Sequence, residues 1–224
     1  MKNKLNILYE DNHVIVVVKE PNVLSQGDAT GDKDLLTMVK EYIKEKYNKP
    51  GNVYCGLVHR LDRPVGGIMV FAKSSKAASR LSEAIKNHKG FDKRYILVCE
   101  GLFKEKEGTF KDYLFKEENG NTVVSDKAHG KESILNYKVL DENKEENLSL
   151  VEVELITGRH HQIRVQFSSR GHTLYGDNRY GNYTGDNICL FAYKLSFVHP
   201  TLKEEKSFEY LPDMKGKGFN KFVI

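Results

Sequence analysis

A single carboxylate, Asp62, stands between two arginines in the segment His59–Gly67. Within this segment Pro64 fixes its own φ and lacks a backbone donor, while the two glycines at its end allow backbone conformations closed to other residues. These residues predict a rigid, bent loop that presents one acid, able to act as a nucleophile or as a base. Catalytic residues often lie on such loops. A surface turn with a solvated ion pair fits the same residues equally well.

A basic cluster further along the chain offers a partner for this acid. Arg159, His161 and Arg164 lie in the first part of a predicted helix, and the last two, three residues apart, are neighbours on one helix face. A close cation keeps a carboxylate ionised even when it is partly buried. Arg164 is therefore the candidate ionic partner of Asp62. The alternative is a basic turn that binds phosphate without catalysis.

Other classes of site lack their usual signatures in this sequence. The histidines do not have the spacing that places two metal ligands and an acid on one helix face, so we expect no metal site. There is no P-loop, no dinucleotide-binding fingerprint and no Gly-x-Ser-x-Gly nucleophile motif. The cysteines, which are isolated in the sequence, argue against a disulfide framework and a zinc site; they are Cys55, Cys99 and Cys189.

The composition is that of a folded chain. At 224 residues it is long enough to bury a core, and its net charge of +4 permits a polyanionic partner without requiring one. The first residues have no apolar segment typical of a secretory signal, and no run approaches the ~20 apolar residues of a membrane-spanning helix. With its isolated cysteines, the chain is expected to be cytoplasmic and to have no membrane partner.

Hydrophobic periodicity predicts the elements that position these groups. A buried strand is expected at Val14–Lys19, and Asp34 is expected to cap a helix over 35–47. A strand at 67–73 follows the Asp62 loop, and Ser74 or Ser75 is expected to cap a helix over 76–88. Further strands are predicted at 93–100, 109–115, 121–125, 132–140, 148–156, 189–198 and 205–211, with a helix over 160–169 and a loosely held tail from Lys215. This pattern indicates an α+β domain around a long, largely antiparallel sheet.

Several motifs together resemble the RluA-type pseudouridine synthases. The central match is His59-Arg60-Leu61-Asp62, and the others follow the family's order along the chain from about residue 7 to about residue 212. They are Lys19-Glu20-Pro21 with Gly27, Lys93–Val98, Glu154–Val165, Gly171-His172 and Gly176–Gly181. The family usually has Thr-Ser-Gly where this chain has Val65-Gly66-Gly67, which leaves the acid in place and alters the turn.

The resemblance implies a fold and a set of roles. It implies the pseudouridine synthase fold, a mixed, mostly antiparallel sheet with flanking helices and a central active-site cleft. We expect one catalytic domain over 1–224, with a core at about 7–212 and a basic tail at 213–224, standing alone without the small N-terminal RNA-binding domain of many relatives. It also implies that Asp62 is the catalytic acid, that Arg164 is its ionic partner and that Tyr95 stacks on the target base.

The remaining expectations concern the substrate. The resemblance favours Arg60 as the residue that helps to flip the base, and the residues expected to bind substrate are Arg60, His59, Arg63, Arg159, His161 and Ile163. Cations that would line a groove for RNA phosphates are Arg63, Lys73, Lys93, Arg94 and Arg159.

The implied reaction isomerises uridine in ribosomal or transfer RNA to pseudouridine. Because it adds and removes nothing, we expect no cofactor, and we expect a monomer. Two alternatives remain. One is a non-catalytic RNA-binding module or RNA chaperone on the same scaffold, and the other is a glycosidase, although that chemistry usually requires two carboxylates.

Overall fold

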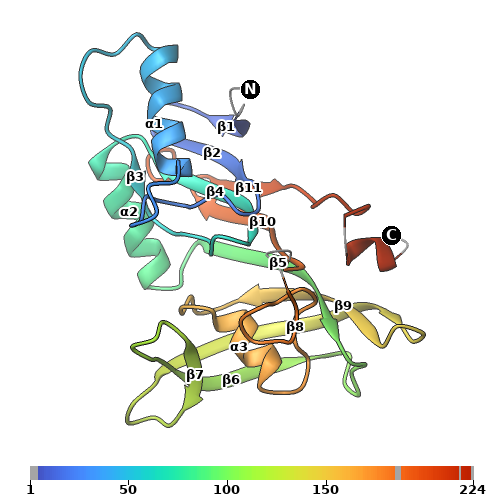
Figure 1. Ribbon diagram of the computed structural model, residues 1–224. Helices are drawn as coiled ribbons and strands as arrows, with labels where there is room; N and C mark the ends of the chain where they lie inside the picture. Colours follow the sequence, from blue (N-terminus) through green and yellow to red (C-terminus); the bar gives the residue numbers. More distant parts are fainter. Residues whose placement is uncertain (1–4, 185–187, 217, 223–224) are drawn as a thin grey trace. The chain divides into compact units, whose positions relative to one another are not determined.

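The computed structural model describes residues 5–184, 188–216 and 218–222 (Figure 1). The chain divides into two compact units, and each is described by itself. Unit 1 comprises Met1–Phe91 and Lys194–Tyr210, and unit 2 comprises Asp92–Tyr193 and Leu211–Ile224. Neither unit is therefore a continuous stretch of sequence. The strand β10 (Leu190–Val198) carries the chain from unit 2 into unit 1.

Unit 1 is a small sheet with two helices. Its strands are β1 (Asn6–Glu10), β2 (Val14–Lys19), β3 (Gly56–Leu57), β4 (Gly66–Ala72), β11 (Glu205–Glu209) and the second part of β10. The order is β1-β2-β4-β10, with β11 paired to β10 and β3 paired to β4. The helices are α1 (Leu35–Lys46) and α2 (Ser75–Lys86).

The central strands β2 and β4 of this sheet are buried on both faces. On one face, Val14 and Val16 of β2 pack with Leu81 of α2 and with Leu195 and Phe197 of β10. The alternate residues of β2 and β4 point to the other face, and they are also inaccessible to solvent; they are Ile15, Val17, Met69 and Phe71. The buried strand predicted at Val14–Lys19 is therefore confirmed as β2.

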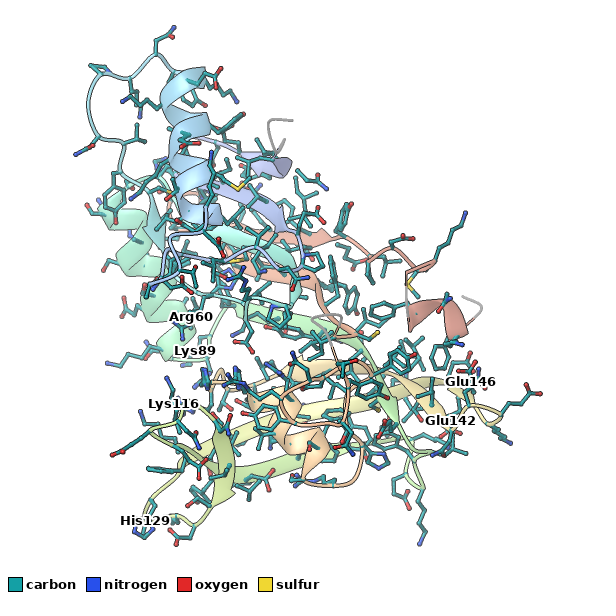
Figure 2. The ribbon with its side chains drawn as sticks, in the orientation of Figure 1. Arg60, Lys89, Lys116, His129, Glu142 and Glu146 are labelled. Atoms are coloured by element: carbon teal, nitrogen blue, oxygen red, sulfur yellow. The ribbon has the colours of Figure 1, made fainter. Side chains whose placement is uncertain are left out.

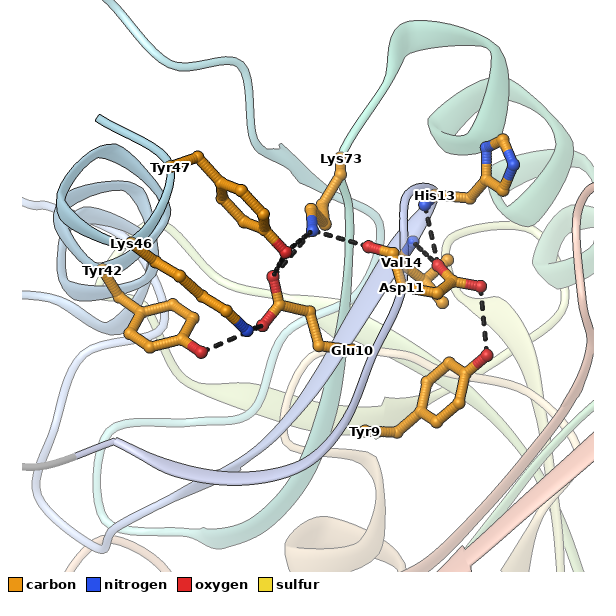
Figure 3. A network of polar contacts seen from close by, with 9 residues as sticks. All are labelled: Tyr9, Glu10, Asp11, His13, Val14, Tyr42, Lys46, Tyr47 and Lys73. Atoms are coloured by element: carbon orange, nitrogen blue, oxygen red, sulfur yellow. Dashed lines mark hydrogen bonds and ion pairs between the residues drawn. The ribbon is translucent and has the colours of Figure 1, made fainter. Parts of the chain in front are cut away.

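A buried carboxylate joins β1 to α1 and β4 (Figure 3). The side chain of Glu10 is 7% exposed and accepts hydrogen bonds from Lys46 and Lys73, each at 2.7 Å. The hydroxyls of Tyr42 and Tyr47 donate to the same carboxylate at 3.0 and 2.8 Å. Burial by itself raises the pKa of Glu10, but these four donors outweigh it and lower the pKa to about 2.

Unit 2 is an antiparallel meander covered by one short helix. Its strands are β5 (Phe91–Glu100), β6 (Glu107–Lys116), β7 (Thr122–Ser125), β8 (Lys131–Asn143) and β9 (Leu148–Leu155). Their order is β5-β9-β8-β6-β7, and the pairs β5/β9, β9/β8, β8/β6 and β6/β7 are antiparallel. The helix α3 (Gln162–Ser168) buries Phe167 against the rings of Phe110 and Tyr137.

The α+β class is confirmed, with a mixed sheet and three α helices in the described part of the chain. Asp34 and Ser74 cap α1 and α2 as predicted, by accepting the backbone N–H groups of Thr37 and Ala77. Two short strands, β1 and β3, were not predicted. The helix predicted over 160–169 begins only at Gln162, because His161 has the left-handed φ of 51°.

The expectation of a loosely held tail is wrong for the part that the structure describes. Phe219 and Phe222 are 7% and 6% exposed, and the segment between them forms a 3₁₀ turn, Phe219–Lys221. The carbonyl of Lys221 accepts a hydrogen bond from Asn143, and its ammonium pairs with Glu146 at 2.8 Å; Glu146 is labelled in Figure 2. Two buried aromatic rings therefore dock this segment within unit 2.

Candidate active site

Asp62 lies in the loop between β3 and β4, at a tight turn. The backbone N–H of Val65 donates to the carbonyl of Asp62 at 3.0 Å and closes the turn. Leu61 and Val65 are 7% and 2% exposed, so the turn is anchored by a buried residue on each side of the half-buried acid. Gly67 has a φ of 138°, which side chains rarely tolerate, where β4 begins opposite Lys19. The bent loop that the sequence predicts is present.

Two side chains fix the backbone of this loop. The hydroxyl of Ser25 donates to the carbonyl of Leu61 at 2.7 Å and accepts the N–H of the same residue at 3.1 Å. The ammonium of Lys19 donates to the carbonyls of Arg63, Glu20 and Val23 at 3.0, 3.1 and 2.6 Å. The main chain is therefore held immediately before and immediately after Asp62.

Lys19 also places a cation near the acid. Its side chain is completely buried at the end of β2. Burial lowers the pKa of Lys19 to about 7, while the negative charge of Asp62 acts in the opposite direction. All three protons of the ammonium are used, which favours the charged form. This role of Lys19 was not predicted. A lysine at the end of an otherwise apolar strand does indicate a buried charge that needs partners.

The other predicted residues of this loop have separate environments. The Nε2 atom of His59 accepts the N–H of Val70 at 3.1 Å, so Nε2 carries no proton, and the ring meets Phe91 edge-on. Arg63 pairs with Asp32 at 2.6 Å in an exposed ion pair. Arg60 is exposed, and its side chain is drawn in Figure 2. That these residues bind substrate stays a prediction.

In unit 2, Arg164 is fixed by an unexpected partner. Its Nε and Nη2 atoms donate to the two carboxylate oxygens of Asp177 at 2.8 and 2.6 Å, and the two residues are 4% and 1% exposed. The guanidinium also lies 5.2 Å from the ring centre of Tyr180. Asp177 lies in the matched segment Gly176–Gly181, but its pairing with Arg164 was not predicted from the sequence. The pairing of Arg164 with Asp62 stays a prediction.

His161 is a neutral residue. Its Nδ1 atom lies 2.8 Å from the hydroxyl of Tyr180, and its ring stacks on His160 with 3.7 Å between the ring centres. Burial lowers the pKa of His161 to about 2, and the charge of Arg164 acts in the same direction. His161 therefore contributes hydrogen bonds rather than a positive charge.

The remaining predicted residues of unit 2 also have defined positions. Tyr95 is 6% exposed on β5, opposite Val153 of β9. Ile163 is 5% exposed within α3. The side chain of Arg159 donates to the carbonyl of Glu132 at 3.0 Å. Their expected roles toward a substrate stay predictions.

The described residues include neither a metal-binding cluster nor a membrane-spanning helix. Among them, no group of three or more histidine, cysteine, aspartate or glutamate side chains has an arrangement that would hold a metal ion. No helix in the described ranges is long and apolar enough to cross a membrane.

Comparisons with known proteins agree with these observations. The family model described as RNA pseudouridylate synthase matches residues 13–169. The uncharacterized RNA pseudouridine synthase YhcT of Bacillus subtilis is 34% identical over 205 residues, which cover 90% of this chain and 66% of that protein. An uncharacterized RNA pseudouridine synthase of Aquifex aeolicus is 32% identical, over 92% of this chain and 68% of that protein. This chain thus spans about two thirds of the length of both relatives.

Solved structures agree on the fold. The structure of human RNA Pseudouridylate Synthase Domain Containing 4 has a TM-score of 0.79 at 20% identity, over 96% of this chain and 92% of that chain. The structure of human RNA Pseudouridylate Synthase Domain Containing 1 has a TM-score of 0.75 at 24% identity, over 96% of this chain and 85% of that chain. With the family match over residues 13–169, the chain belongs to the RNA pseudouridylate synthase family, whose enzymes are isomerases.

Proposed function

We propose that this protein converts uridine in RNA to pseudouridine and that Asp62 is the catalytic carboxylate. The observation that carries the proposal is the loop around Asp62, whose backbone is fixed by Ser25 before the acid and by Lys19 after it. A catalytic group must be held in a defined position to lower the barrier of its reaction. A solvated surface turn has no need of two buried side chains that clamp its carbonyls.

The chemistry of the reaction fits a single acid. The bond from the ribose to N1 of uracil breaks, the same sugar is rejoined to carbon 5, and carbon 5 loses a proton while N1 gains one. The carboxylate of Asp62 attacks the sugar as a nucleophile or removes a proton as a base. Both routes require the ionised form of Asp62, and the side chain of Lys19 holds the backbone directly after it.

The target base has to leave its stack before it can react. In the proposal, Tyr95 supplies an aromatic surface for the extruded uracil and Arg60 assists the extrusion, while Arg164 supports the acid. The rival function is an RNA-binding module without catalysis, and the acid discriminates between the two, because a binding surface for phosphates gains nothing from a carboxylate.

Ribosomal RNA is the first substrate to test. The ribosomal large subunit pseudouridine synthase C of Vibrio parahaemolyticus is 30% identical over 207 residues, which cover 88% of this chain and 62% of that protein. Its name supports large-subunit ribosomal RNA as a substrate for this chain, and transfer RNA is the second candidate.

The proposal is tested by incubating unmodified large-subunit ribosomal RNA and transfer RNA with wild-type protein and with Asp62→Asn. Pseudouridine is then measured by mass spectrometry of nuclease digests. New pseudouridine with the wild type alone is the expected result. Equal conversion by Asp62→Asn would exclude Asp62, and RNA binding without conversion by either protein would support the binding module.

A further inference from the structure

Lys93 differs from the other cations that were expected to meet RNA phosphates. Arg94 contacts the carboxylates of Asp92, Glu152 and Glu154 at 3.2, 3.5 and 3.9 Å. Lys73 pairs with Glu10, Arg63 pairs with Asp32, and Arg159 donates to a backbone carbonyl. The ammonium group of Lys93 makes no hydrogen bond and no ion pair with any residue that the structure describes.

The side chain of Lys93 is partly buried. Desolvation lowers its pKa, and the charge of the adjacent Asp92 acts in the opposite direction. A Cβ atom at Gly158 would lie 3.2 Å from Nζ of Lys93, so the ammonium lies beside a residue that has no side chain to cover it. A buried cation without a partner is costly, and an anion from outside the protein would relieve that cost.

The position of Lys93 on β5 indicates which anion this is. Residues two apart on a strand project from the same face, so Lys93 and Tyr95 share a face and Arg94 projects from the opposite one. Two residues of strand span about 7 Å. A nucleotide whose base lies on Tyr95 carries its phosphate one ribose away from that base, a span of similar size.

We infer that Lys93 binds a phosphate oxygen of the nucleotide whose base stacks on Tyr95. This inference rests on the proposed function, because it takes RNA as the substrate and Tyr95 as the stacking residue. The contact of Lys93 would position the target nucleotide. Arg94 has no such role in this inference, because carboxylates of the protein already neutralise its charge.

The test compares Lys93→Met, Lys93→Arg and a matched control, Lys138→Met. Lys138 is exposed on β8 opposite Glu152, on the face of the sheet that faces away from Tyr95. Binding of unmodified transcripts of large-subunit ribosomal RNA is measured by filter binding across a series of salt concentrations. The rate of pseudouridine formation is measured on the same transcripts at limiting and at saturating RNA.

Lys93→Met should lower the affinity for RNA and kcat/KM by about tenfold. The slope of log affinity against log salt should become shallower by about 0.7, as expected for one lost phosphate contact on single-stranded RNA. Lys93→Arg should keep the wild-type slope because it keeps the charge, and Lys138→Met should match the wild type in every measurement. The melting temperature of Lys93→Met should not fall, since the lysine has no described hydrogen-bond partner to lose.

An unchanged salt slope in Lys93→Met would overturn the inference. An equal loss of affinity in Lys93→Arg would also overturn it, because the effect would then depend on the shape of the side chain rather than on its charge. If wild-type protein makes no pseudouridine, the proposed function fails, but the binding slopes still decide whether Lys93 contacts a phosphate.

Discussion

The ammonium of Lys19 donates a hydrogen bond to the carbonyl of Arg63, the residue directly after Asp62, over 3.0 Å. Through this bond a completely buried side chain at the end of β2 holds a loop that is distant in the sequence. Lys19 is therefore a positioning residue for Asp62 and lies in the same unit as the acid. Four predictions follow from this and from three other contacts.

Replacing Lys19 with Met should destabilise the protein and impair the chemical step. The change leaves three backbone carbonyls without their donor, at a cost of about 3 kcal/mol in the free energy of unfolding. Urea unfolding measures this cost. Because Asp62 loses its support while RNA contacts remain, kcat should fall more than KM rises. The control is Lys33→Met, which removes an exposed lysine. If the two variants lost equal unfolding free energy, the hydrogen bonds of Lys19 would not hold the loop of Asp62.

Replacing Asp177 with Asn should be strongly destabilising. It replaces a charged hydrogen-bond acceptor of the buried Arg164 guanidinium by a neutral one, and breaking a buried pair typically costs about 3–5 kcal/mol. The exposed pair of Lys33 and Glu41 provides the comparison, for which Glu41→Gln should cost less than about 1 kcal/mol. Urea unfolding of the two variants at the same pH gives both values. Similar costs would mean that the Asp177 pair is screened by solvent.

Glu10 should contribute to the acid sensitivity of unit 1. Its pKa is lowered from 4.5 to about 2 in the folded state, so the unfolded chain binds the proton first as the pH falls. The resulting stability, about 3 kcal/mol, is fully present above pH 4.5 and is lost as the pH falls to about 2. The difference in unfolding free energy between wild type and Glu10→Gln should therefore shrink across this range. A difference that does not change with pH would contradict the assigned pKa.

His161 should not titrate near neutral pH. Burial lowers its pKa to about 2, so the ring stays neutral throughout the range in which RNA binding is measured. Nuclear magnetic resonance of the ring should show no chemical-shift transition for His161 between pH 5 and pH 8. Replacement by Gln should leave the pH dependence of RNA binding unchanged over the same range. A transition with a midpoint near pH 6.5, the ordinary value for histidine, would refute this prediction.

Local sequence signals predicted the parts of the fold that depend on local chemistry. The cap at Asp34 and the helix that follows it depend on neighbouring residues, and both are confirmed. The start of α3 was misplaced because His161 has a left-handed backbone, which nothing in the spacing of the apolar residues indicates. The docking of Phe219 likewise depends on tertiary contacts that periodicity does not encode.

In the candidate site, too, features set by neighbouring residues were predicted and features set by tertiary contacts were not. Asp62 was found from its own neighbours, because the proline and glycines that bend its loop adjoin it. Lys19 and Ser25 were missed as supports, since their partners are backbone carbonyls, which every residue possesses and no sequence pattern marks. Asp177 was missed because a single acid in a loop gives no sign of which arginine it will meet.

The interleaving of the two units along the chain constrains how the protein can fold during synthesis. Leu195 and Phe197 belong to the buried cluster of unit 1, yet they are translated after almost all of unit 2. The first 91 residues therefore leave the ribosome with an incomplete apolar core, which has to wait for β10. Most of unit 2 is contiguous, since its strands β5 to β9 and α3 follow one another along the chain and emerge together before β10. We expect the segment with Asp62 to reach its final shape late, after the segment with Tyr95.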